Sequence, residues 1–224
     1  MFGITGWTDT IRLSGLLYSG TLTTVKIFFL TLIFSLPLGL IVALGSSSKR
    51  KWISGPIKLY ILIMRGTPLL LQIIFIYFAP FYMLPEGMKI NLDRFIAAVI
   101  AFSLNYAAYF AEIFRGGIES ISHGQYEAAS VLGFTRTQTF LRIILPQVIK
   151  RILPPVSNEV ITLLKDTALV QIIGISELLR VAQNEASRIF SIMPIFVAGL
   201  FYLLMNWVVT KVFHKAEKKL SYYK

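Results

Sequence analysis

The chain has 224 residues, of which 55% are hydrophobic and 15% charged, and its net charge at pH 7 is +11. A mean hydropathy of +0.69 excludes an ordinary soluble domain, and the length fits a single transmembrane domain over residues 1–224. Because cysteine is absent and only two histidines occur, the composition excludes disulfides, thiol catalysis and cysteine-based metal sites. We therefore expect no metal and no cofactor.

Five apolar stretches are long enough to cross a membrane. A hydrocarbon core about 30 Å thick needs about 20 mostly apolar helical residues. The first stretch is too long for the core of a secretory signal and no cleavage site follows it, so we interpret it as a retained span. The sequence predicts an all-α, polytopic membrane helical bundle with five transmembrane helices, at residues 27–44, 59–81, 95–114, 156–175 and 192–213.

Basic residues are distributed unevenly over the segments between these spans. The segments after the first, third and fifth spans carry fourteen Lys and Arg against three acids, with Lys211 at the end of the fifth span counted in the segment after it, whereas the remaining segments carry six against five. Cytoplasmic segments are the ones enriched in Lys and Arg. This predicts an N-terminus outside and a C-terminus in the cytoplasm, and it explains the basic excess by membrane topology in place of nucleic-acid binding.

The segment between the third and fourth spans, residues 115–155, is too polar to cross the membrane and carries helix signals. Ser122 and Thr135 each stand three residues before a glutamine, which is the spacing of a capping box that begins a helix. Gly133 favours the end of the first helix, and Pro146 predicts an interruption of the second. We expect a helix-turn-helix held against the membrane.

A DNA-reading helix-turn-helix is an alternative for the same segment, because residues 129–135 and the amphipathic stretch after them have a similar pattern. Membrane spans tether the segment at both ends, and a recognition helix so tethered could hardly enter a major groove. A second alternative is that the hairpin packs on its own bundle, as part of its apolar face is expected to do.

A family signature lies in this segment. Glu127, Ala128 and Ala129, then Gly133 and finally the Leu145–Pro146 pair, resemble at every defining spacing the EAA loop of ABC importer permeases. Other segments resemble the polar amino acid (histidine/glutamine type) branch of these permeases, at residues 65–68, 105–106, 111–118, 145–147 and 164–167. One departure is Leu62, where the resemblance leads us to expect an acidic residue shortly before Arg65.

The resemblance implies one half of a type I importer in the plasma (inner) membrane of a prokaryote. It implies a second permease copy, identical or different, two ABC ATPase subunits and an external solute-binding protein as partners. It also assigns coupling to the ATPase to Glu127, Ala128, Ala129, Gly133, Leu145 and Pro146. Since the chain has no G-x-x-x-x-G-K-[ST] phosphate loop, we expect ATP to be hydrolysed on a separate subunit and this chain to be no enzyme.

Five ionisable residues fall inside the predicted spans: Arg65, Glu112, Glu159, Lys165 and Asp166. At about 3 kcal/mol each, the three charges of the fourth span would cost about 9 kcal/mol in lipid, against about 5 kcal/mol from its apolar residues. They must therefore face protein or water. Helical spacing places them on one side of the span together with Asn158 and Thr162.

Two interpretations of these charges stay open. In the structural one, Lys165 or Arg65 forms a fixed ion pair with Asp166 or Glu112 across the bundle. In the functional one, the carboxylates line a path and receive the α-ammonium or a cationic side chain of the solute. Glu159 is the first choice for that role, because no basic residue lies three or four positions from it.

Proline and glycine at residues 65–68 predict an interruption of the second helix, where freed backbone groups can line a site. The remaining polar side chains at similar depth suit either helix packing or ligand binding. The candidate substrate-binding residues are Glu159, Asp166, Gln72, Thr67, Asn105, Tyr109, Glu112 and Thr162.

We expect the protein to import a polar amino acid by alternating access. Three carboxylates against two bases inside the spans favour a cationic substrate such as arginine, lysine or histidine. The alternatives are an uncharged amino acid such as glutamine or cystine and, outside this class, an ATP-independent secondary transporter or channel.

Overall fold

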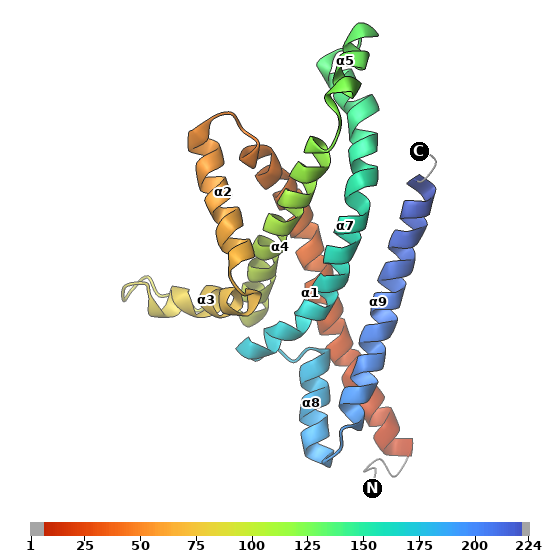
Figure 1. Ribbon diagram of the computed structural model, residues 1–224. Coiled ribbons are helices and arrows are strands. Elements are labelled where there is room, and N and C mark those ends of the chain that lie inside the picture. The colour runs from red at the N-terminus through yellow and green to blue at the C-terminus, as the bar shows by residue number, and fades with distance from the viewer. Residues whose placement is uncertain (1–6, 221–224) are drawn as a thin grey trace.

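The computed structural model describes residues 7–220 of the chain, with side chains from residue 12 onward. Every regular element in this part is a helix (Figure 1). The α-helices are α1 (Trp7–Ser46), α2 (Lys51–Gly66), α3 (Leu69–Tyr82), α4 (Arg94–Glu119), α5 (His123–Val131), α6 (Arg136–Thr139), α7 (Leu145–Asp166), α8 (Leu178–Ile189) and α9 (Met193–Leu220). A π-helix, η1 (Phe140–Ile144), precedes α7, and a 3₁₀-helix, η2 (Thr167–Ile173), follows it.

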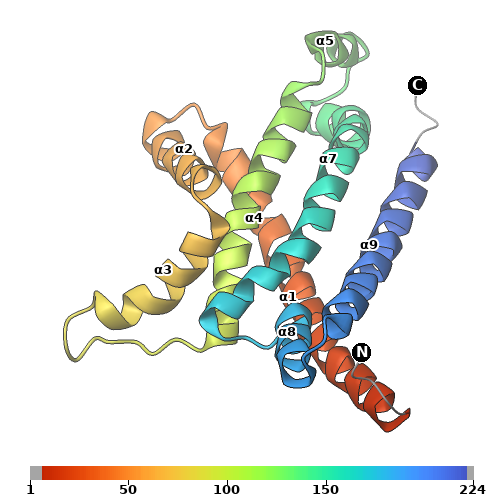
Figure 2. The same ribbon diagram turned by 60° about the horizontal axis from the view of Figure 1, so that its bottom comes forward.

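The long helices α1, α4, α7 and α9 run lengthwise through the bundle (Figures 1 and 2). Helices α5 and α6 and the turn between them form a hairpin, which we call the α5 hairpin. The α5 hairpin and the last turns of α9 lie at one end, and the start of α1 and α8 lie at the other (Figure 1). The first and last helices of the described chain thus begin and end at opposite ends of the bundle.

The predicted count of five spans is not confirmed. Three of the described helices are long and apolar enough to cross a membrane, namely Arg12–Ser46, Arg94–Glu119 and Met193–Leu220. The α2–α3 pair makes a fourth candidate only if it is one broken span, because the two helices meet at 111°. The predicted fourth span is not among these candidates, because charged residues repeat along α7 and make it less apolar.

The interruption predicted at residues 65–68 is confirmed. Helix α2 ends at Gly66, Thr67 is extended with φ −121° and ψ 148°, and α3 begins after Pro68. Helix α3 therefore does not continue in the direction of α2, and its far end extends outward from the long helices (Figure 2).

The interruption predicted at Pro146 is wrong. Helical structure continues without a break from Arg136 through η1 into α7, and Pro146 lies in the first turn of α7. Pro146 has no N–H to donate, and the residues just before it bond in the π-helical pattern, with the N–H of Leu145 donating to the carbonyl of Phe140. The helix ends beyond η2, where Gly174 adopts the left-handed conformation with φ +81°.

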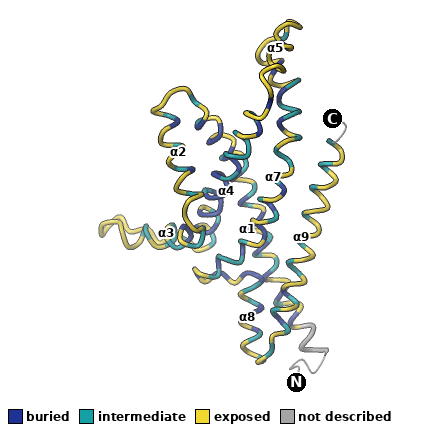
Figure 3. Tube along the Cα trace, in the orientation of Figure 1, coloured by how far each residue is buried: buried dark blue, intermediate teal, exposed yellow. Residues whose placement is uncertain are grey.

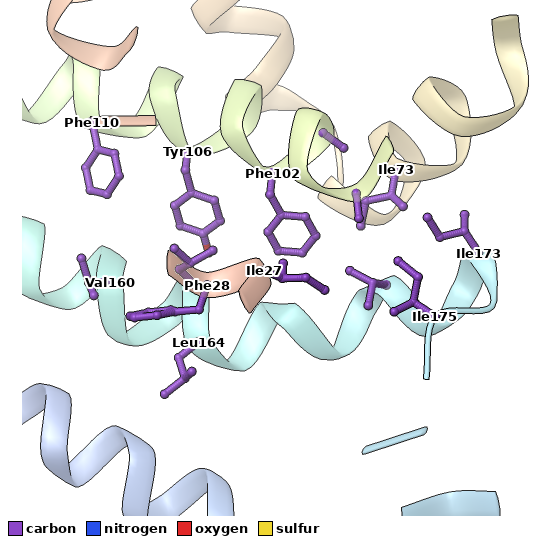
Figure 4. Packing of buried hydrophobic residues seen from close by; sticks show 14 residues of the cluster. Ile27, Phe28, Ile73, Phe102, Tyr106, Phe110, Val160, Leu164, Ile173 and Ile175 are labelled. Atoms are coloured by element: carbon purple, nitrogen blue, oxygen red, sulfur yellow. The ribbon is translucent and has the colours of Figure 1, made fainter. Parts of the chain in front are cut away.

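The core lies where α4 meets α1 and α7 (Figure 3). Phe102, Tyr106 and Phe110 stand four residues apart on one face of α4 and are fully buried, or nearly so (Figure 4). Val160 and Leu164 of α7 pack in the same cluster. This packing fixes one face of α7 against α4 and determines how the polar residues of α7 are presented.

Candidate functional site

The side-chain amides of Gln72 and Asn105 brace the break between α2 and α3. Pro68 has no N–H, so the carbonyl of Met64, four residues earlier, lacks its helical donor. Gln72 Nε2 and Asn105 Nδ2 both donate to this carbonyl, each at 3.0 Å. Gln72 Nε2 also donates to the Thr67 hydroxyl at 2.8 Å, and its Oε1 accepts from Asn105 at 2.9 Å. Three predicted substrate contacts are therefore engaged within the protein.

Arg65 belongs to a chain of charges that continues along α4. Its guanidinium lies 3.4 Å from the Glu112 carboxylate and 5.4 Å from the centre of the Tyr109 ring. Glu112 also accepts from Arg115 at 2.7 Å, and Arg115 pairs with Glu119 at 2.6 Å. Of the ion pairs considered from the sequence, Arg65 with Glu112 is the one present, and Glu112 has two basic partners.

Glu159 and Asp166 lie on the side of α7 that faces the core. Both are half-buried, and they are seven residues apart, which places them on one line of the helix. Asp166 accepts a hydrogen bond of 2.7 Å from the hydroxyl of Tyr106. Glu159 makes no hydrogen bond or ion pair in the described chain, and Arg65 and Asp166 act on it electrostatically.

The single polar side expected for α7 is in fact two adjacent sides. Asn158, Thr162 and Lys165 are exposed, and the Thr162 hydroxyl donates back to the Asn158 carbonyl at 3.0 Å. Packing against α4 separates this exposed line from that of Glu159 and Asp166. Lys165 therefore points away from the bundle.

No group of three His, Asp or Glu side chains that could hold a metal ion occurs in residues 7–220.

Sequence reasoning passed over Tyr106 as a site residue. Its hydroxyl holds Asp166, while its ring stacks on Phe102 with centroids 6.3 Å apart. The available signal was the repeat of aromatic residues every four positions along α4, which indicates a face packed against another helix. A tyrosine in such a row brings a hydroxyl into an apolar interface, where it needs a partner.

The α5 hairpin has one of its two predicted capping boxes. Thr135 and Gln138 form the reciprocal bonds, with Gln138 N donating to the Thr135 hydroxyl at 3.3 Å and Thr135 N donating to Gln138 Oε1 at 3.0 Å. Ser122 makes no side-chain cap, so the first box is wrong. The physical reason is that Gln125 accepts from Gln147 of α7 at 3.1 Å instead.

The exposed surface of α5 includes only part of the predicted coupling set. Glu127 and Ala128 are exposed, whereas Ala129 is 1% exposed and packs inward. The end of α5 presents two apolar side chains that the sequence interpretation did not single out, Val131 at 88% and Leu132 at 73% exposed. Their position just before the turn at Gly133 was the signal that could have identified them.

The base of the hairpin is fixed to the bundle. Ile121, Ile144 and Val148 form a small buried cluster, and Arg151 of α7 donates to the carbonyl of Ser120. Leu145 and Pro146 are half-buried beside it. The hairpin therefore rests on the end of α4, which carries Glu112, and on the beginning of α7, which carries Glu159.

Comparison with known proteins identifies relatives over nearly the whole chain. The family model described as "Binding-protein-dependent transport system inner membrane component" matches residues 35–222. The L-cystine transport system permease protein TcyB of Bacillus subtilis is 39% identical, over 93% of this chain and 88% of its own length. The arginine transport system permease protein ArtQ of the same species is 37% identical, over 90% of this chain and 91% of its own.

Solved structures agree with these relatives. The crystal structure of an amino acid ABC transporter with histidines is 34% identical, with a TM-score of 0.85 over 96% of this chain and 99% of that one. An inward-facing form of the MetNI methionine ABC transporter has a TM-score of 0.72 at 15% identity, over 94% of this chain and 98% of that one. The second likeness shows the fold alone, which is that of type I ABC importer permeases.

Proposed function

We propose that this protein imports a cationic amino acid by alternating access. The chain belongs to the family of binding-protein-dependent transport system inner membrane components, and it is an amino acid ABC importer permease subunit and no enzyme. The cationic amino acids meant here are arginine, lysine and histidine. The permease would bind the substrate near the middle of the membrane and release it to the cytoplasm.

Glu159 carries the proposal. It is a half-buried carboxylate in a membrane helix, without a hydrogen bond or ion pair in the described chain. A carboxylate at membrane depth is costly unless a cation or a donor compensates it. Glu112 is already paired with two arginines, and Asp166 has the Tyr106 hydroxyl, so Glu159 is the group best able to receive an ammonium or guanidinium.

An uncharged amino acid is the second candidate. The relatives include permeases named for cystine and for glutamine as well as for arginine. Arg65 stands close enough to act on Glu159, and in that arrangement the two groups could receive the carboxylate and the ammonium of any zwitterionic amino acid.

The proposed arrangement in the membrane has five crossings. They are α1, the bent α2–α3 pair, α4, α7 with η2, and α9, with the N-terminus outside and the C-terminus in the cytoplasm. The basic excess on the hairpin side supports this orientation through the rule that cytoplasmic segments are enriched in Lys and Arg. A second permease copy would shield the exposed polar line of Asn158, Thr162 and Lys165 from lipid.

The α5 hairpin is the proposed binding site for the ATPase subunits. Two ABC ATPase subunits would bind Glu127, Ala128 and the apolar end of α5, while Ala129 and Gly133 shape the hairpin and Leu145 and Pro146 support it. The rigid attachment of the hairpin to α4 and α7 supports this role. An external solute-binding protein would deliver the amino acid at the opposite end of the bundle.

The test uses the reconstituted importer with its ATPase subunits and binding protein. ATP hydrolysis is measured against arginine, lysine, histidine, glutamine and cystine. We expect the cationic amino acids to stimulate most, and Glu159→Gln to raise the arginine concentration for half-maximal stimulation by about ten-fold or more, as expected for the loss of a hydrogen bond to a charged group. Glu86→Gln is the matched control, because Glu86 lies in an exposed loop.

Two outcomes would contradict the proposal. An unchanged arginine response in Glu159→Gln would remove Glu159 from the site. Stimulation of ATP hydrolysis by glutamine or cystine alone would show that the substrate is an uncharged amino acid. The protein would then still be an amino acid importer subunit.

A further inference from the structure

A groove lies between α2 and α4, in the half of the bundle that carries the α5 hairpin. It consists of two cavities of about 350 and 530 Å³ that share Lys58 and Glu112 in their walls. The cavity nearer the α2–α3 break is partly apolar and is lined by Ile61, Leu62 and Arg65. The other cavity is mainly polar and reaches the turn between α1 and α2, so the groove changes from apolar to polar along its length.

The groove as a whole carries one more base than acids, because Lys58, Arg65 and Arg115 line it together with Glu112 and Glu119. Both acids of its wall are already paired, Glu112 with Arg65 and Arg115, and Glu119 with Arg115. Lys58 forms no hydrogen bond or ion pair in the described chain, and it acts on Glu112 only through space. The groove therefore has an available cation where its apolar part begins.

The turn between α1 and α2 closes the polar end. The serine side chains at 46–48 line the cavity, and three consecutive bases follow at residues 49–51. Trp52, which is 73% exposed, begins the outer face of α2, and tryptophan is enriched at the interface between membrane and water. Further along, Leu59 and Ile63 are exposed and apolar, as expected of a face that contacts lipid chains.

We propose that this groove binds an anionic phospholipid from the leaflet on the side of the α5 hairpin. The phosphate lies against Lys58 and the serine turn, and an acyl chain lies along Ile61 and Leu62. Basic clusters just outside a membrane helix attract anionic headgroups, and each base contributes a factor of about five to the affinity. The choline of a zwitterionic lipid cancels the charge of its own phosphate, so such a lipid gains less from Lys58 and the site discriminates by charge.

The bound lipid touches both α2 and α4 beside the ion pair of Arg65 and Glu112. Its headgroup adds negative charge next to a network whose arginines already hold Glu112 and Glu119. Because the groove is lined by residues of both α2 and α4, a bound lipid contacts the two helices at once. Glu159 does not line the groove, so failure of the lipid site would leave the proposed role of Glu159 unaffected.

Trp52 provides the reporter for a direct test. The full-length protein carrying Trp7→Phe and Trp207→Phe is placed in bilayers of phosphatidylcholine that contain either brominated phosphatidylglycerol or brominated phosphatidylcholine. Bromine on the acyl chains quenches a nearby indole. We expect the anionic lipid to quench Trp52 at a mole fraction about five-fold lower than the zwitterionic lipid does.

Substitutions at two lysines locate the effect. Lys58→Gln is expected to bring the two lipids to within about two-fold of each other, and Lys58→Arg is expected to keep the preference. Lys215→Gln is the matched control, because Lys215 is an exposed base on α9 at the same end of the bundle and outside the groove. Helical circular dichroism and a single size-exclusion peak establish that each variant is folded.

Equal quenching of the parent by the two lipids would overturn the proposal, and so would a full anionic preference in Lys58→Gln. Soluble glycerol 3-phosphate distinguishes a lipid site from a site for free phosphate. A change of Trp52 fluorescence with glycerol 3-phosphate, in a protein that shows no preference between the lipids, would assign the groove to a soluble anion and refute the lipid.

Discussion

The side-chain amide of Asn105 on α4 donates to the carbonyl of Met64 on α2 at 3.0 Å, across 41 positions of the chain. The acceptor is free because Pro68 cannot donate to it. Asn105→Ala leaves this part-buried carbonyl with one donor fewer, and we expect a loss of about 1–3 kcal/mol in the free energy of unfolding. Thermal unfolding in detergent measures the change.

Ser103→Ala is the matched control for Asn105. Ser103 is buried on the same helix, and its hydroxyl has no hydrogen-bond partner in the described chain. Its removal is expected to change stability by less than about 0.5 kcal/mol. Equal losses in both variants would show that the amide is not what holds the break together.

The break itself was predictable from the sequence, whereas its brace was not. Glycine and proline at 66 and 68 act locally, through the missing N–H, and local chemistry is visible in a sequence. The pairs Asn105 with Met64, Arg65 with Glu112 and Tyr106 with Asp166 join residues far apart in the chain, and only the packing of α4 against its neighbours brings them together.

The extents of the helices were less predictable than their existence. Helix α1 begins at Trp7, twenty residues before the predicted span, because hydroxyl side chains such as Thr21 donate to their own helix at Leu17 and allow polar residues inside it. Helix α7 has helical periodicity but carries too many charges for its apolar length to indicate a crossing. The sequence therefore located this helix, but whether it crosses a membrane does not follow from its length and composition.

Tyr106→Phe tests how Asp166 is held. The substitution keeps the ring that stacks on Phe102 and removes the hydroxyl that donates to the carboxylate. We expect a loss of about 1–3 kcal/mol in stability, because Asp166 keeps its burial and loses its donor. Tyr18→Phe, at an exposed tyrosine of α1, is the control in the same unfolding experiment. A loss of the same size at Tyr18 would refute the assignment.

Gly133→Ala tests the backbone of the hairpin. Gly133 has φ +77°, and a Cβ there would meet no atom within 4 Å, so the whole cost is conformational. We expect a loss of about 1–2 kcal/mol. Gly124→Ala has the opposite expectation, a gain of about 0.5–1 kcal/mol, because Gly124 is helical and equally open. Calorimetric unfolding of both variants compares the signs, and a stable Gly133→Ala would contradict the strain.

Val131→Ser combined with Leu132→Ser tests whether the ATPase subunits bind at the end of α5. Both side chains are highly exposed, so the double variant is expected to fold normally and to lose most of its association with the ATPase subunits in pull-down. Ile192→Ser removes an exposed apolar side chain directly before α9, which begins at the end of the bundle opposite the hairpin (Figure 1), and should retain the association. Undiminished association of the double variant would move the contact away from the end of α5.

Glu177 predicts a pH dependence at the end of the bundle opposite the hairpin. Its buried carboxylate caps α8, accepting from the N–H groups of Leu179 and Arg180 at 2.7 Å and from the Tyr202 hydroxyl at 2.9 Å. Burial raises the pKa of Glu177 above its ordinary value of 4.5. Its contribution to stability is therefore complete below pH 4.5 and is lost as the pH rises through the folded-state pKa. Glu177→Gln should remove this decline.

Glu185, which lies further along the same helix α8, should behave in the opposite sense. Its hydrogen bond to Arg188, 2.6 Å long, lowers the pKa of Glu185 below 4.5. This contribution is present above pH 4.5 and disappears as the pH falls through the lowered pKa. Melting temperatures of the parent, Glu177→Gln and Glu185→Gln between pH 3 and 8 separate the two effects, because the first variant gains relative stability toward high pH and the second loses it. Parallel curves for all three proteins would show that neither carboxylate titrates as its surroundings require.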